Sequence, residues 1–213
     1  MTTKDYLTIR ENTTHEITIK KSRFICSLTR VKDEAAAKAF IDKIKAIHRK
    51  ATHNCFAYQI GADDHIQRES DNGEPSGTAG IPILEALQLV GVHDVCAVVT
   101  RYFGGIKLGA GGLIRAYSNA TSEAIKQAGL VQRVQQALLQ INVPYKLHDQ
   151  LIYFLKEQQL EVANEEYGVD IQTTIFVDEA QVSAVQEQLT NRFSDQLTIR
   201  KNGTRFHEIP YEN

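Results

Sequence analysis

The feature that most constrains the fold of this chain is a cluster of glycines that directly follows an apolar run. Five of the 13 glycines lie between Gly104 and Gly112, after the apolar run 95–99. Such a run predicts a buried strand, and from Leu113 onward apolar residues recur at helical spacing. The glycines therefore lie in a strand-to-helix connection, where they let the backbone adopt positive φ and let another group approach closely.

The start of the helix after this loop predicts a site for an anion. Backbone N–H groups at a helix N-terminus favour negative charge, and cationic residues accompany them in the sequence. The candidate residues are Arg101, Gly104, Gly105, Lys107, Gly109, Gly111, Gly112 and Arg115. A structural interpretation stays open, because glycines after a buried strand also serve tight turns and packing. Either arginine could instead pair with Asp71 or Glu74 and join two glycine-rich segments.

The spacing of these glycines excludes the two standard phosphate-binding motifs. Gly104 and Gly109 are followed by Ala110, where G-x-x-x-x-G-K-[ST] requires Lys. The segment 109–111 has Ile114 where G-x-G-x-x-G requires its last glycine. The loop therefore does not indicate a nucleotide hydrolase of the P-loop type or a dinucleotide enzyme.

A second glycine-rich segment, residues 70–82, is dense in turn-forming residues, and 71–73 is a hairpin-type turn signal. Its candidate site residues are Asp71, Gly73, Glu74, Gly77 and Thr78. The two acids could serve as a general acid and base. We favour the simpler interpretation, in which Asp71 caps its own turn and Glu74 is solvated. Pro82 suits the first turn of a helix.

Four segments, in this order, resemble the signatures of one family. They read K-K-S-R-F-I-C (20–26), A-T-H-N-C-F-A-Y (51–58), S-D-N-G-E-P-S-G-T-A-G-I-P (70–82) and V-V-T-R-Y-F-G-G-I-K-L-G-A-G-G-L-I-R-A-Y (98–117). Long motifs in a fixed order are specific. The first 130 or so residues closely resemble the Impact family, in its bacterial YigZ branch.

The resemblance implies an α+β fold class with two domains. The first would have a ribosomal-protein S-five domain-two-like fold. The second would be ferredoxin-like and resemble the last domain of elongation factor G. Eukaryotic Impact proteins modulate amino-acid-starvation signalling to the translation initiation factor kinase, so the resemblance implies a binding protein of the translation system.

The periodicity of the chain predicts the same two-part organisation without that help. Strands are expected at 17–20, 23–28, 53–60, 66–70 and from 95, and helices at 33–50, near Pro82 and from Gly111 to Gly129. A β-α-β-β-α-β pattern follows, with strands at 138–143, 160–162, 171–177 and 197–200. We expect domains at 1–130 and 134–213, with the polar segment 129–136 as their boundary.

Charge is distributed unevenly along the chain. Residues 1–130 contain 17 basic and 14 acidic residues, and residues 131–213 contain seven and 12. A secondary basic surface is expected from Lys20, Lys21, Arg23, Lys43, Lys45, Arg49 and Lys50. Contact with phosphate backbones and a solvated helix face both explain this concentration. With no base-stacking aromatic motif visible, nucleic-acid binding would depend on shape or backbone.

The remaining composition indicates a folded protein of a reducing compartment. Cys26, Cys55 and Cys96 lie in apolar runs and read as buried free thiols, and no metal-ligand spacing surrounds them. Charges interrupt every apolar stretch, so no targeting or membrane-spanning segment is expected. We expect a cytoplasmic protein with no cofactor, no metal and no membrane partner.

Two classes of function follow from these patterns. The first is a non-enzymatic, translation-associated binding protein that contacts RNA, the ribosome or a protein of the translation machinery. The second is a nucleotide- or small-ligand-binding enzyme that uses the glycine loop 104–112, which resembles in outline the loop of the galactokinase and homoserine kinase group. That group has small hydroxylated residues where this chain has Ala110, Gly111 and Gly112, and no catalytic partner is evident. We favour the binding protein.

Overall fold

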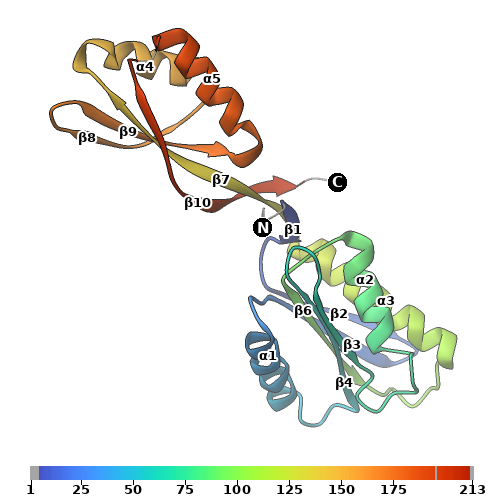
Figure 1. The fold of residues 1–213 in the computed structure, drawn as a ribbon. Helices are drawn as coiled ribbons and strands as arrows, with labels where there is room; N and C mark the ends of the chain where they lie inside the picture. Colours follow the sequence, from blue (N-terminus) through green and yellow to red (C-terminus); the bar gives the residue numbers. More distant parts are fainter. Residues whose placement is uncertain (1–4, 195, 212–213) are drawn as a thin grey trace. The chain divides into compact units, whose positions relative to one another are not determined.

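A computed structural model describes residues 5–194 and 196–211 of the chain (Figure 1). The chain divides into two compact units, whose described parts are residues 5–133 with 208–211, and 134–207. Each unit has its own hydrophobic core. The expected α+β class with two domains is confirmed.

The first unit is built around a five-stranded sheet between helices. Its strands, in spatial order, are β2 (Thr13–Ile19), β3 (Ser22–Arg30), β6 (Val95–Tyr102), β4 (His53–Ile60) and β5 (Ile66–Ser70), and the pairs are antiparallel. Helix α1 (Glu34–Ile47) covers one face, and α2 (Gly80–Val90) and α3 (Ala110–Ala128) cover the other (Figure 1). The central strand β6 is buried from Val95 to Arg101, as its unbroken apolar run predicts.

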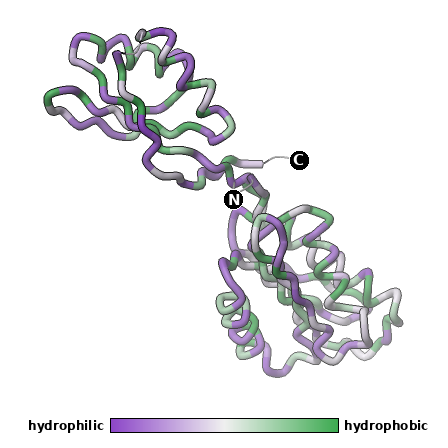
Figure 2. Tube along the Cα trace, viewed as in Figure 1, coloured by the Kyte–Doolittle hydropathy of each residue, from purple (hydrophilic) through white to green (hydrophobic). Residues whose placement is uncertain are grey.

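The second unit has the expected β-α-β-β-α-β order. Its elements are β7 (Leu130–Val143), α4 (Tyr145–Glu157), β8 (Val162–Tyr167), β9 (Ile171–Asp178), the short η1 (Glu179–Gln181), α5 (Val182–Phe193) and β10 (Thr198–Tyr211). The sheet order is β10-β7-β9-β8. Apolar residues of α4 and α5 pack with alternate residues of β7 and β9 in one core. The strand β10 is mostly hydrophilic (Figure 2).

Strand β8 begins later than the strand expected at 160–162. The N–H of Leu160 donates to the carbonyl of Leu155 at 2.8 Å, so Leu160 closes the end of α4. Gln159 just before it adopts φ +57°, a left-handed conformation that ends a helix. The apolar pattern at 160–162 therefore spans a helix end and the first residue of the strand.

The observed second unit begins at Val134, the residue expected for the second domain, but it ends at His207 rather than at residue 213. The polar segment 129–136 lies mostly in β7, whose first four residues pair with β1 (Tyr6–Ile9), a strand that the sequence pattern did not predict. At the other end, residues 208–211 belong to the first unit. There Arg30 Nη1 donates to Glu208 Oε1 at 2.6 Å, which links β10 to β3 of the first unit.

Candidate anion-binding site

Four connecting segments meet at one end of the first sheet, which we call the loop end. It consists of residues 20–22, 48–53, 71–79 and 103–109. The antiparallel register explains the meeting, because Arg23 at the start of β3 pairs with Tyr102, and His53 at the start of β4 pairs with Arg101. All four segments that carry the family resemblance therefore contribute to one end of this unit.

The turn between β2 and β3 lies against the start of the glycine loop. A Cβ atom built on Gly104 would lie 2.0 Å from the backbone carbon of Lys21, so only glycine fits there. The N–H of Gly104 donates to Ser22 Oγ at 3.1 Å. Because of this close approach, Lys21 and its neighbour Lys20 lie beside the start of the glycine loop, and both are exposed.

The segment after α1 lies against the same loop. The N–H of Phe103 donates to Thr52 Oγ1 at 3.1 Å, and His48 Nδ1 lies 3.0 Å from the hydroxyl of Tyr102. Arg49 and Lys50, which are exposed, follow directly after His48. Cations from two separate segments therefore lie near the end of β6.

Asp71 holds the second glycine-rich segment by capping α2, rather than only its own turn. Its carboxylate accepts the N–H groups of Gly77, Ala79 and Gly80 at 2.8–2.9 Å. The segment thus connects β5 to a helix and is not a hairpin. Burial raises the pKa of Asp71, but the three backbone N–H groups outweigh it, so the pKa lies below its ordinary value.

Glu74 is buried, and the expectation that it is solvated was wrong. One carboxylate oxygen accepts hydrogen bonds from Arg101 Nη1 at 2.6 Å and from the Tyr117 hydroxyl at 2.8 Å. The other lies 3.7 Å from His53 Nε2. The guanidinium of Arg101 lies 5.4 Å from the ring centre of Phe24 and 5.5 Å from that of Phe103. This buried ion pair joins the two glycine-rich segments.

The burial of this network corrects the role of Arg101 as an exposed anion ligand. Its side chain is 6% exposed and its charge is neutralised by Glu74. Burial, then the neighbouring Cys55 and Glu74, raises the pKa of Tyr117 far above its ordinary value, so the phenol stays protonated as a donor. Burial likewise raises the pKa of Cys55 to about 12, so its thiol is not a ready nucleophile.

The exposed side of the loop end carries the start of α3. Gly109 precedes the helix with φ +72°, and no side chain of residues 5–194 or 196–211 caps it. The N–H groups of the first turn therefore lack a side-chain partner. A Cβ built on Gly111 would meet only Arg115 Nη1, at 3.8 Å, so the guanidinium reaches back over this first turn. Lys107 is exposed in the same loop, beside Gly105 with φ +85°.

The remaining sequence-predicted residues have local roles. Thr78 donates to the carbonyl of Pro75 at 2.6 Å, Gly73 and Gly77 have positive φ, and a Cβ on Gly112 would lie 3.0 Å from that of Leu108.

The residues of the expected basic surface do not form one continuous patch. Arg23 forms a two-pronged ion pair with Glu16, and Lys45 Nζ lies over the ring of Phe56 at 5.6 Å. Lys43 lies a full turn of α1 before the loop end, beside a small groove over β2 and β3. The exposed cations that the fold gathers at the loop end and on the first turns of α3 next to it are Lys20, Lys21, Arg49, Lys50, Lys107 and Arg115.

Sequence reasoning missed three residues of the site: His53, Phe103 and Tyr117. The sequence feature that could have identified them is that each lies within one of the segments that carry the family resemblance. Cys26, Cys55 and Cys96 are buried free thiols, as expected. Residues 5–194 and 196–211 contain no cluster of three metal-ligating side chains, and no helix among them is long and apolar enough to cross a membrane.

Comparison with known proteins agrees with this arrangement. Residues 20–125 match the Impact N-terminal domain, and residues 141–196 match a domain of unknown function (DUF1949). The IMPACT family member YvyE of Bacillus subtilis is 45% identical over 206 residues, which cover 97% of this chain and 93% of that protein. YigZ of Escherichia coli is 49% identical over 111 residues, 51% of this chain and 54% of its own.

A solved structure supports the same relationship over both units. It is titled "Crystal structure of an hypothetical protein" and is similar with a TM-score of 0.59 and 31% identity, covering 93% of this chain and 98% of that one. The resemblance noted in the sequence is therefore confirmed, and the chain belongs to the IMPACT family.

Proposed function

We propose that this protein is a non-enzymatic, translation-associated binding protein whose loop end contacts RNA phosphates, on the ribosome or on free RNA. The observation that carries the proposal is the meeting of six exposed cations with the uncapped N-terminus of α3 at one end of a sheet. Backbone N–H groups and the helix dipole favour an anion there, and a cluster of cations favours a polyanion over a single phosphate.

The chemistry of the buried network supports binding rather than catalysis. Glu74 is engaged by Arg101 and Tyr117, and Cys55 and Tyr117 are held protonated. A general base or a nucleophile needs a group that can exchange its proton near neutral pH. These residues instead hold the loop end in a fixed shape, which lowers the entropy cost of binding.

The proposal is tested by co-sedimentation of the full chain with ribosomes, and with ribosome-free RNA, over a salt series. We expect association that weakens as salt rises, with a slope that reports several phosphate contacts. Association that is absent at low salt, or that does not change with salt, would remove the proposal. A thermal shift with nucleoside triphosphates tests the competing ligand, because a bound nucleotide would stabilise the fold. We expect no such shift.

A further inference from the structure

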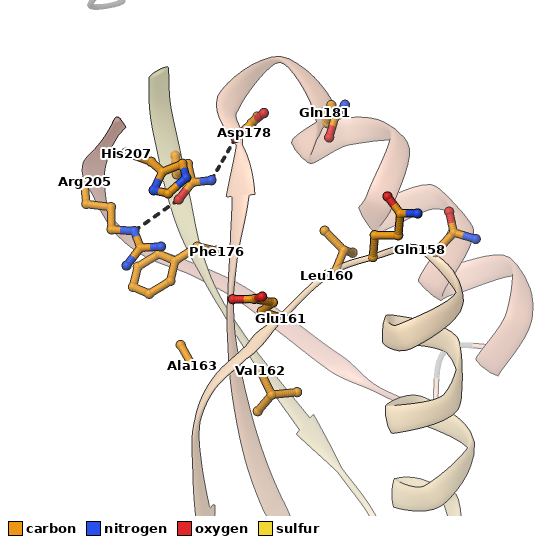
Figure 3. A pocket seen from close by; sticks show the side chains of 12 residues that line it. Gln158, Leu160, Glu161, Val162, Ala163, Phe176, Asp178, Gln181, Arg205 and His207 are labelled. Atoms are coloured by element: carbon orange, nitrogen blue, oxygen red, sulfur yellow. Dashed lines mark hydrogen bonds between the residues drawn. The ribbon is translucent and has the colours of Figure 1, made fainter. Parts of the chain in front are cut away.

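The second unit contains a cleft of about 780 Å³ that shares no residue with the loop end (Figure 3). Its walls are the end of α4, the start of β8 and the adjoining ends of β7, β9 and β10. All of its lining residues lie between 136 and 207, within the second unit. The lining is polar, with amide, carboxylate, imidazole and guanidinium groups in one concave surface.

One guanidinium in this cleft belongs to the exposed residue Arg205 and contacts two neighbouring side chains. The Cζ atom of Arg205 lies 3.3 Å from the ring centre of Phe176, so the two planar groups stack face to face. Arg205 Nε donates to Gln136 Oε1 at 3.1 Å (Figure 3). The two terminal amino groups of Arg205 make no hydrogen bond with any residue that the structure describes. They form a planar pair of donors, which is the geometry that a carboxylate accepts.

A negative charge is held next to this guanidinium by the same amide. Gln136 Nε2 donates to Asp178 Oδ1 at 2.9 Å. The Gln136 amide therefore bonds to the Arg205 guanidinium through its oxygen and to the Asp178 carboxylate through its nitrogen. The second oxygen of Asp178 has no hydrogen-bond partner among the described residues. Figure 3 shows the carboxylate of Glu161 extending from the opposite wall toward the side that holds Phe176 and Arg205.

The charges of the cleft restrict what can fill it. A ligand that pairs with one guanidinium and two carboxylates supplies an acceptor to the first and donors to the others. Residues 134–207 contain six basic and ten acidic residues, so the surroundings disfavour a phosphate. A ligand with both a negative and a positive group meets these requirements.

We propose that this cleft binds a small zwitterion of the α-amino acid class. The carboxylate of the ligand pairs with the terminal amino groups of Arg205, and its ammonium group pairs with Asp178 and Glu161. In an α-amino acid one carbon carries both a carboxylate and an ammonium group, and the cleft likewise holds a guanidinium and a carboxylate that bond to the same Gln136 amide. Gln158 and Gln181 line the rest of the cleft and face the ligand side chain. This site goes beyond the proposed function and does not depend on it.

The first test needs no variant. Isothermal titration of the full chain against L-α-amino acids with neutral, acidic and basic side chains should give at least one that binds. Its N-acetyl and carboxamide derivatives, which each remove one charge, should bind about tenfold or more weakly, since each loses a charge-assisted hydrogen bond. Failure of all the amino acids to bind, equal binding of the derivatives, or preferred binding of a nucleoside or nucleotide would overturn the proposal.

The second test uses variants of the stacked arginine. Arg205→Ala should abolish binding of the best amino acid, and Arg205→Lys should weaken it, because an ammonium group cannot form the same two-pronged pair. Arg200→Ala, a matched control on the same strand and outside the cleft, should bind like the wild type. Salt-dependent RNA association should be equal in all three variants. An Arg205→Ala protein that melts like the wild type and still binds the amino acid would contradict the assignment.

Discussion

The loop end contains two regions that come from the same signature segments but differ in the surroundings of their charges. In the buried region, Glu74, Arg101 and Tyr117 satisfy one another beneath the loops. In the exposed region, Lys107 and Arg115 lie near a helix start that no side chain in the described part of the protein caps. The difference shows that a charged residue in a family signature has one of two roles: it stabilises the arrangement of the loops, or it is available to bind a ligand. Burial and pairing distinguish the two.

The largest expected effect is in the buried region. Glu74→Met or Arg101→Met alone should lower the free energy of unfolding by about 3–5 kcal/mol, because each leaves an unpaired buried charge. Replacing both with Met should cost much less than the sum of the two single losses. Urea denaturation of the four proteins measures the coupling, with Glu85→Gln, an exposed carboxylate on α2, as control. Additive losses would show that the pair does not join the segments.

The next largest effect is expected at Gly104, the first glycine of the loop. Gly104→Ala forces a Cβ into the backbone of Lys21, so it should destabilise the protein by at least the ~1–3 kcal/mol of an overpacked core. Thermal melts measure this loss. If Gly104→Ala melts like the wild type, the close approach of the β2–β3 turn to the loop is not required.

Asp71→Asn should cost about 0.5–2 kcal/mol, as the loss of a helix cap does. The effect should depend on pH with a defined sign. Because the folded-state pKa of Asp71 is depressed, its contribution is present above the unfolded pKa of about 3.9 and is lost as pH falls through the folded pKa. Melts between neutral and acidic pH should therefore converge for wild type and variant at low pH. A constant difference over the whole range would contradict the carboxylate's role.

Gly111→Ala should act in the opposite direction on stability. A Cβ there would meet only Arg115 Nη1, at an ordinary contact distance of 3.8 Å, so the variant should gain about 0.5–1 kcal/mol. It should also weaken RNA association, since a methyl group would narrow the approach to the helix N-terminus. A stabilised protein with unchanged association would show that this glycine does not serve binding.

The sequence predicted most of the architecture because local patterns carry it. The apolar run before Gly104 and the helical spacing after Leu113 predicted β6 and α3 close to their observed ends. Strand β1 escaped prediction because it is four residues long and is specified by pairing with β7, more than 120 residues away. A pattern within a short window does not contain such a partner.

The candidate site was predicted less completely, for the same physical reason. Glu74 lies among turn-forming residues, which favour exposure, and its burial depends on Arg101 and Tyr117, 27 and 43 residues further along the chain. The polar lining of the cleft in the second unit likewise comes from strands that are far apart in the sequence, among them β7, β9 and β10. In contrast, the exposed loop with Lys107 follows directly from its position after a buried strand.

The central claim is that the exposed region of the loop end contacts a polyanion. Lys107→Glu tests it most directly, because an exposed loop charge contributes little to folding and can change binding alone. The measurement is ribosome or RNA co-sedimentation over a salt series, with Lys38→Glu as the control. Lys38 is exposed on α1, about 15 Å along the helix from its end at the loop end.

We expect Lys107→Glu to melt like the wild type, to bind RNA or ribosomes more weakly, and to lower the salt slope by about one. Lys38→Glu should match the wild type at every salt concentration. Binding by Lys107→Glu that equals the wild type throughout the series would contradict the claim that this loop receives an anion.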